Sequence, residues 1–133
     1  FSEQQALYCA TSHPLFGQPD ISLDDLDRCD HVLHAYRSIS IHQPMQASLS
    51  TARCEQVEGS LAFILSGAHI GYLPEHIAAP WVANGTLRAL QPEQLGFSVD
   101  FHLASHRGRH PGDAQRAFVE DLQAAFGAVN AGF

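Results

Sequence analysis

The sequence predicts an α/β domain in which a largely parallel sheet carries helices. Short apolar runs typical of buried strands alternate along the chain with stretches of helical periodicity, and no internal repeat is visible. Residues 97–103 alternate strictly between apolar and polar side chains, which marks the clearest strand. With 133 residues, 45% of them hydrophobic, the chain can bury the core of one domain of ordinary size.

The first third of the chain predicts two strands and one short helix. Residues 7–10 form an apolar run that predicts a buried strand, followed by a loop with Pro14 and Gly17. Ser22 has the spacing of a helix N-cap with an acid three residues on, so a short helix is expected through Leu26. Residues 31–36 are predicted to form the second strand.

The middle of the chain predicts a weak strand and a well-marked helix. Residues 47–51 alternate weakly and suggest a third strand. Residues 54–66 are predicted to be helical, because apolar side chains recur on one face at Val57, Leu61, Ile64 and Leu65. Gly67 follows as the expected C-cap, because glycine takes positive φ without a Cβ clash.

A short strand and a second helix are expected next. The strand covers residues 69–73, and Gly71 within it indicates close approach by another segment or a ligand. Pro74 suits the first turn of the next helix, which Asn84 and Gly85 end. Residues 87–90 predict another short strand, followed by a turn over residues 91–93.

The last element is predicted to be a helix that begins near Asp113. Phe118, Leu122 and Phe126 form its apolar stripe. We expect this stripe to be underpacked or to recruit another chain.

Composition narrows the class of protein. The formal charge of −7 disfavours contact with nucleic acid by these residues. Three widely spaced cysteines form no disulfide framework and favour a reducing, cytoplasmic location. No apolar run reaches the roughly 20 residues of a membrane helix, and no signal peptide is visible. Because residue 1 is Phe1, the chain is expected to be a fragment.

Nine histidines raise the question of a metal site. His102, His106 and His110 recur every four residues, but residues four apart on a strand lie ~13 Å from each other. Gly108 and Pro111 exclude one continuous helix there. We therefore predict no metal and no cofactor.

Two further kinds of site are disfavoured. Cys29 and His31 lie two apart, but no oxyanion hole or orienting acid accompanies them, so thiol catalysis is not expected. The segment SGAHIGYLP, residues 66–74, reverses the strand–glycine–helix order that dinucleotide binding needs. It is best explained as a joint between a helix and a strand.

The segment EGSLAFILSGAHIGYLPEHIAAPWVANGTLRAL, residues 58–90, resembles the effector-binding domain of LysR-type transcriptional regulators. The family pattern has an apolar helix, a glycine-rich turn, a GIxxLP-like strand, a helix and a G-x-L before a strand. It is matched here by Gly67, Ile70, Gly71, Leu73, Pro74, Gly85 and Leu87. Residues 13–26 and 101–122 resemble the family's hPL segment and its final strand, loop and helix.

The resemblance implies a two-lobed fold like that of type 2 periplasmic binding proteins. Residues 7–11 and 97–104 would be the crossover strands. The second lobe would span approximately residues 11–97, and residues 98–133 would form the second crossover strand and the C-terminal part of the first lobe. The first half of the first lobe and the N-terminal helix-turn-helix would then lie outside this chain of 133 residues.

The implied function is ligand-responsive control of transcription. A small effector, such as a carboxylate or polar metabolite, would bind in the cleft between the lobes and act on DNA through the missing N-terminal domain. The resemblance implies a homodimer or homotetramer and no catalytic activity. By position, the candidates for the cleft wall are Ser12, Tyr36, Arg37, Ser38, Thr51, Ala68 and His69, while Gly67, Gly71 and Pro74 would shape the turn.

Two alternatives from other classes remain open at this point. A solute-binding protein would share the lobe architecture but would be secreted. A small metal-dependent enzyme would use the histidines as ligands.

Overall fold

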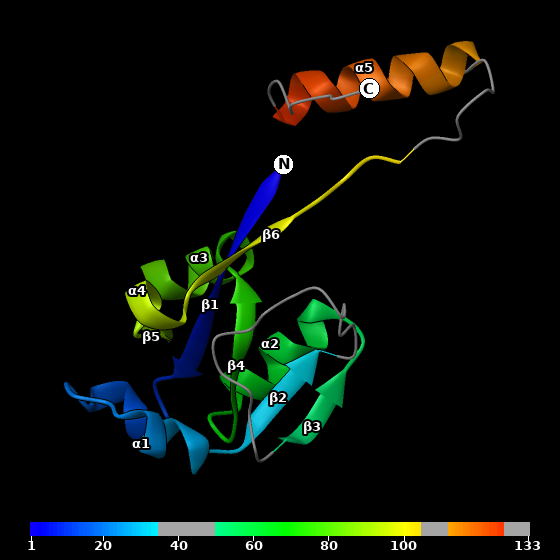
Figure 1. Ribbon diagram of the computed structural model, residues 1–133. Coiled ribbons are helices and arrows are strands. Elements are labelled where there is room, and N and C mark those ends of the chain that lie inside the picture. The colour runs from blue at the N-terminus through cyan, green and yellow to red at the C-terminus, as the bar shows by residue number, and fades with distance from the viewer. Residues whose placement is uncertain (35–49, 105–111, 127–133) are drawn as a thin grey trace. The chain divides into compact units, whose positions relative to one another are not determined.

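The computed structural model describes residues 1–34, 50–104 and 112–126 (Figure 1). The chain divides into two compact units. The larger unit is Glu3–Val99, and the smaller unit joins Phe1–Ser2 to Asp100–Phe133. Each unit is described by itself.

The elements alternate between strands and helices along the chain. In order they are β1 (Ser2–Ala10), the 3-10 helix η1 (Pro14–Gly17), α1 (Leu23–Asp27), β2 (His31–His34), β3 (Ser50–Cys54), α2 (Val57–Leu65), β4 (Ile70–Pro74), α3 (Glu75–Ala83), β5 (Leu87–Leu90), α4 (Pro92–Leu95), β6 (Phe97–Asp100) and α5 (Asp113–Phe126).

One mixed sheet organises the chain. Its strand order is β3-β2-β4-β1-β5, and β6 pairs with β1. β2 is parallel to β3 and β4, whereas β1 is antiparallel to both β4 and β5. Strands β2, β3, β4 and β5 therefore point the same way, which confirms the expected α/β sheet with largely parallel strands.

The direction of β1 defines two edges of this sheet. Tyr8 is opposite Gly71 and Gln5 is opposite Pro74, so β1 ends where β4 begins. We call this the amino edge, because β2, β3 and β4 all start there. The carboxyl edge is the opposite one, where these three strands end and the chain continues into α2 and α3.

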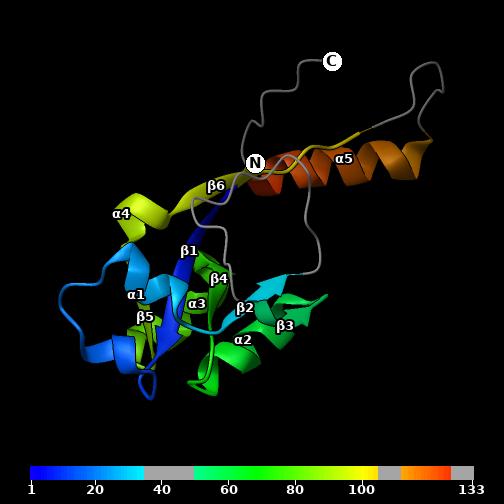
Figure 2. The ribbon, with the colours of Figure 1, turned by 60° about the horizontal axis from the view of Figure 1, so that its bottom comes forward.

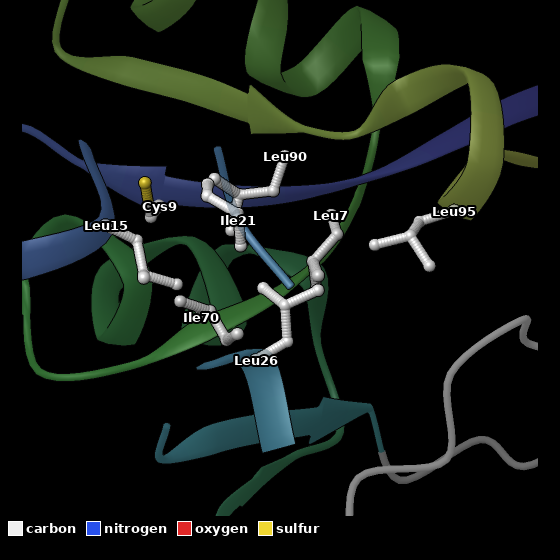
Figure 3. Packing of buried hydrophobic residues seen from close by; sticks show 8 residues of the cluster. All are labelled: Leu7, Cys9, Leu15, Ile21, Leu26, Ile70, Leu90 and Leu95. Atoms are coloured by element: carbon white, nitrogen blue, oxygen red, sulfur yellow. The ribbon is translucent and has the colours of Figure 1, made fainter. Parts of the chain in front are cut away.

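Strand β1 supplies both hydrophobic cores of the larger unit, because successive side chains point to opposite faces. Leu7 and Cys9 belong to the first core (Figure 3). Its other members are Leu15, Ile21, Leu26, Ile70, Leu90 and Leu95. Ala6, Tyr8 and Ala10 face the second core, with Val32, Ile64, Leu73, Ala78 and Leu87. Burying one such leucine contributes roughly 1.5–3 kcal/mol, so β1 is anchored from both sides.

The helices that cover these cores follow from the sequence. Helix α2 packs on β2, β3 and β4, and α3 packs on β4 and β5 (Figure 2). Helix α1 begins with the expected capping box: the Ser22 hydroxyl accepts from the Asp25 amide, and the Asp25 carboxylate accepts from the Ser22 amide at 2.9 Å. The pKa of Asp25 lies below its usual value, chiefly because the Ser22 hydroxyl, and then the Ser22 amide, donate to its carboxylate.

Several predicted boundaries were wrong. Cys54 is the last residue of β3, opposite His34 on β2, so α2 begins only at Val57. Pro74 ends β4 and caps α3 instead of entering its first turn. Two residues of the predicted turn over 91–93 belong to the short helix α4, which begins at Pro92, and β6 ends at Asp100. The predicted strands over 31–36 and 47–51 lie partly outside the described residues.

In the smaller unit, Phe1 contacts both the segment after β6 and the end of helix α5. Phe1 and Phe101 exchange two backbone hydrogen bonds, of 2.8 and 3.2 Å, as one pair of an antiparallel ladder does. The Phe1 ring stacks on Phe101 at 4.8 Å and on Phe126 at 4.2 Å between centroids. No residue of α5 is buried, and Phe118 is 60% exposed. The apolar stripe of α5 is thus underpacked, as expected.

Gly67 offers a test of the joint between α2 and β4. Its φ is +76°, and a Cβ there would overlap the Ser12 side chain. Gly67→Ala should therefore lower the free energy of unfolding by about 2–4 kcal/mol, from backbone strain plus overlap. Gly85→Ala is the matched control, because φ is +77° but nothing lies within 4 Å of an added Cβ. Gly85→Ala should lower the free energy of unfolding, measured by chemical denaturation, by about 1 kcal/mol. Equal losses in the two variants would contradict the role given to Ser12.

Candidate functional site

Four of the seven predicted site residues come together at the amino edge of the sheet. Ser12 follows β1, Thr51 lies in the first half of β3, and Ala68 and His69 precede β4. The other three, Tyr36, Arg37 and Ser38, lie outside the described residues.

His69 is the centre of this group. Its Nε2 lies 3.1 Å from the Thr51 hydroxyl oxygen, and its ring meets Phe63 edge-on at 5.0 Å between centroids. Its Nδ1 is buried and has no hydrogen-bond partner among the described residues. The Ala68 amide donates to the Ser66 hydroxyl at 3.3 Å, which stabilises the turn after α2. These contacts hold the turn beside the start of β3.

The glycines of the turn allow close packing. The Ser12 side chain lies against Gly67, where a Cβ would overlap it. At Gly71 a Cβ would lie 2.6 Å from Cγ1 of Val32 on β2. Strands β2 and β4 and the loop after β1 therefore approach one another more closely than larger residues would allow.

Two buried histidines beside this group were missed by the sequence analysis. His13 is 7% exposed and His31 is 3% exposed. Nδ1 of His13 accepts from the Leu15 amide at 3.2 Å and so caps η1. Nε2 of His31 lies 2.9 Å from the Leu26 carbonyl oxygen and must donate to it. The residue pair His13-Pro14 was a usable signal, because a polar side chain before proline often caps a helix.

The electrostatics of this edge favour the neutral form of His13. Burial lowers the pKa of His13, and the nearby His31 and His69 lower it further. A proton on Nδ1 would also remove the acceptor for the Leu15 amide. The surroundings of His13 therefore favour its uncharged form.

The chemistry available to the described residues is limited. In residues 1–34, 50–104 and 112–126, no three His, Cys, Asp or Glu side chains are placed to hold one metal ion. His106 and His110 lie outside these ranges. Burial raises the pKa of the Cys29 thiol, and Cys29 Sγ donates to the Asp25 carbonyl at 3.2 Å, so Cys29 is not an activated nucleophile.

The carboxyl edge has a different character. There β2 ends at His34, β3 at Cys54 and β4 at Pro74, and α2 and α3 begin within three residues of the last two. Open α/β sheets bind ligands outside the carboxyl ends of their parallel strands. Tyr36, Arg37 and Ser38 come soon after the last residue of β2 in the sequence, outside the described residues.

Comparison with known proteins identifies the family. The model of the LysR substrate binding domain matches residues 1–127, so the chain belongs to this family of LysR-type transcriptional regulators. The chain is 36% identical over 123 residues to the HTH-type transcriptional activator BauR from Pseudomonas aeruginosa. That match covers 90% of this chain and 40% of BauR.

Solved structures agree on the fold. A mutant of the regulatory domain of HypT from Salmonella typhimurium superposes with a TM-score of 0.65 at 17% identity, covering 94% of this chain and 64% of that one. The regulatory domain of AphB from Vibrio vulnificus gives 0.59 at 15% identity, covering 93% and 65%. The predicted periplasmic-binding-protein-like α/β fold is confirmed. The chain spans less than two thirds of each relative. None of its described helices has the length and apolar character of a membrane span.

The buried His13 makes stability depend on pH. Because folding lowers its pKa, the unfolded chain takes up a proton at a higher pH than the folded chain does. The contribution of neutral His13 is complete above the ordinary pKa of 6.5 and is lost as the pH falls from there through the folded pKa. The slope cannot exceed about 1.4 kcal/mol per pH unit for one proton.

The test compares denaturation between pH 8 and 5 in three proteins. His13→Asn keeps an acceptor for the Leu15 amide but cannot be protonated, so its stability should fall less steeply below pH ~6.5 than that of the unmodified protein. His102→Asn, at an exposed position, should follow the unmodified protein. An unchanged slope in His13→Asn would show that His13 is not the titrating group.

Proposed function

We propose that this chain is the effector-sensing part of a transcription factor of the LysR type. The observation that carries the proposal is the family match over residues 1–127, supported by 36% identity to a transcriptional activator. This membership favours a regulator over a secreted solute-binding protein. LysR-type regulators are not enzymes, and we propose the same for the protein that carries this chain.

The proposed protein acts in the cytoplasm and contacts DNA through an N-terminal helix-turn-helix domain. A homodimer or homotetramer is part of the proposal. A small effector shifts the equilibrium between two states of the regulator only by binding them with different affinity. The net charge of −7 supports the proposal that these residues bind the effector, while other residues of the protein bind DNA.

We propose that residues 11–97 form the second lobe and that residues 98–133 form the second crossover strand and part of the first lobe. The compact unit Glu3–Val99 supports this boundary. Within the second lobe, we place the effector at the carboxyl edge, with Tyr36, Arg37 and Ser38 as its side-chain contacts. A cation and two hydroxyls suit a small carboxylate or polar metabolite.

For Ser12, Thr51, Ala68 and His69 the same proposal gives a supporting role. They lie at the amino edge, and their described contacts are with one another, with α2 and with the turn that follows α2. Their effect on effector binding would be indirect, through the position of β3 and β4.

The experiment is a thermal-shift screen of metabolites on the full-length protein, followed by titration of the hit. A ligand that binds only the folded state raises the apparent stability. Arg37→Ala should weaken a carboxylate effector at least tenfold, because a charge-assisted hydrogen bond contributes about 1.5–3 kcal/mol.

Arg28→Ala is the matched control, since Arg28 is an exposed arginine at the C-cap of α1, before the start of β2 and away from the carboxyl edge. It should leave the affinity within about twofold, as expected for a surface charge. If Arg28→Ala and Arg37→Ala weaken effector binding equally, Arg37 is not its ligand. If the hit binds but never alters DNA binding, the proposed sensing function fails.

A further inference from the structure

A cavity of about 320 Å³ opens within the larger unit, beside α1 and the end of β5. Its lining comes from the loop before α1, from α1 and from β5 and the residue after it: Pro19, Asp20, Ile21, Ser22, Asp25, Arg88 and Gln91. Its volume falls in the range of small-molecule sites. None of the four effector candidates that the structure describes lines it.

The guanidinium of Arg88 is held in place but only partly used. Its Nη1 donates to the carbonyl oxygens of Phe16 at 2.6 Å and Gln18 at 2.8 Å, with Leu15 at 3.4 Å. Nε and Nη2 of Arg88 form no hydrogen bond with any described residue. No carboxylate of the described residues lies within 4.0 Å of the Arg88 guanidinium. Nε and Nη2 together form the side of a guanidinium that binds a carboxylate through two hydrogen bonds.

Another part of the cavity lining is fixed by Gln91. Its side-chain amide donates to the Ile21 carbonyl and so ties the loop before α1 to the end of β5. Gln91 has a left-handed backbone, with φ of 44° and ψ of 55°, which a non-glycine residue adopts only when its surroundings require it. A cavity whose walls are already fixed binds a ligand with little ordering cost.

Two carboxylates complete the lining. Asp25 accepts from the amide and the hydroxyl of Ser22, at 2.9 and 2.6 Å, and these bonds lower its pKa, so it is ionised at neutral pH. Asp20 is exposed. The cavity thus presents one cation with free donors and two anionic groups.

We propose that this cavity binds a small zwitterion of single-amino-acid size, with its carboxylate on Nε and Nη2 of Arg88 and its ammonium group at Asp20 and Asp25. A simple acid would meet the two carboxylates, and a simple amine would meet the guanidinium. Only a molecule with both groups satisfies both walls. This site is separate from the effector residues proposed above and does not depend on that function.

The test is calorimetric titration of the full-length protein with the protein amino acids. Each is compared with the amine that lacks its carboxylate and the acid that lacks its amino group. At least one amino acid should bind, and its matched amine and acid should bind at least tenfold more weakly. The proposal is wrong if no amino acid binds, or if an amine or acid binds as tightly.

Four variants test which residues bind the amino acid. Arg88→Lys should weaken it more than tenfold, because lysine cannot form the paired hydrogen bonds. Asp20→Asn should weaken it two- to fivefold, as expected for loss of one exposed ion pair. Asp24→Asn removes an exposed acid of α1 that does not line the cavity, and it should change nothing. Binding that is lost in Arg37→Ala but kept in Asp20→Asn would place the ligand at the effector residues and overturn the proposal.

Discussion

Burial of β1 on both of its faces is the constraint on which the larger unit depends. Residues 6–10 are all buried, and their side chains alternate between the two cores. Leu7 and Cys9 belong to the first core, and Ala6, Tyr8 and Ala10 belong to the second. On either side the backbone of β1 is paired, with β4 through Gln5–Tyr8 and with β5 through Leu7–Ala10. A slip of one residue would exchange the two sets of side chains, because the side-chain period of a strand is two. The register of this one strand therefore determines how the helices on both faces pack.

The direction of β1 also separates the two kinds of surface. Because β1 runs against its neighbours, it delivers Ser12 and His13 to the edge where β2, β3 and β4 begin. There the buried histidines and the small residues of the turn after α2 make a closely packed joint. The opposite edge receives the ends of the same three strands and is the one that α/β folds use for ligands. One antiparallel strand in a parallel sheet thus distinguishes the closely packed amino edge from the carboxyl edge, where we propose that the effector binds.

The sequence was most informative where a signal is local. The Ser22–Asp25 capping box, the stripe of α2 and the positive φ of Gly67 each depend on residues within a few positions. Boundaries that depend on a distant partner were misplaced: Cys54 belongs to β3 because His34 pairs with it. The edge to which Ser12 and His69 belong follows from the direction of β1, which no spacing reveals. The cavity at Arg88 brings together residues 70 apart in sequence, and it follows from the pairing of β1 with β5.

Hydrogen exchange of the full-length protein tests the central role of β1 most directly. Amides from Leu7 to Ala10 are buried and lie in the middle of the sheet, so they should exchange only when the whole larger unit unfolds. Their protection should equal the free energy of unfolding measured with denaturant and should fall with it in Gly67→Ala. Amides of the exposed helix α5 should exchange through smaller openings. Exchange in β1 as fast as in α5 would contradict the account.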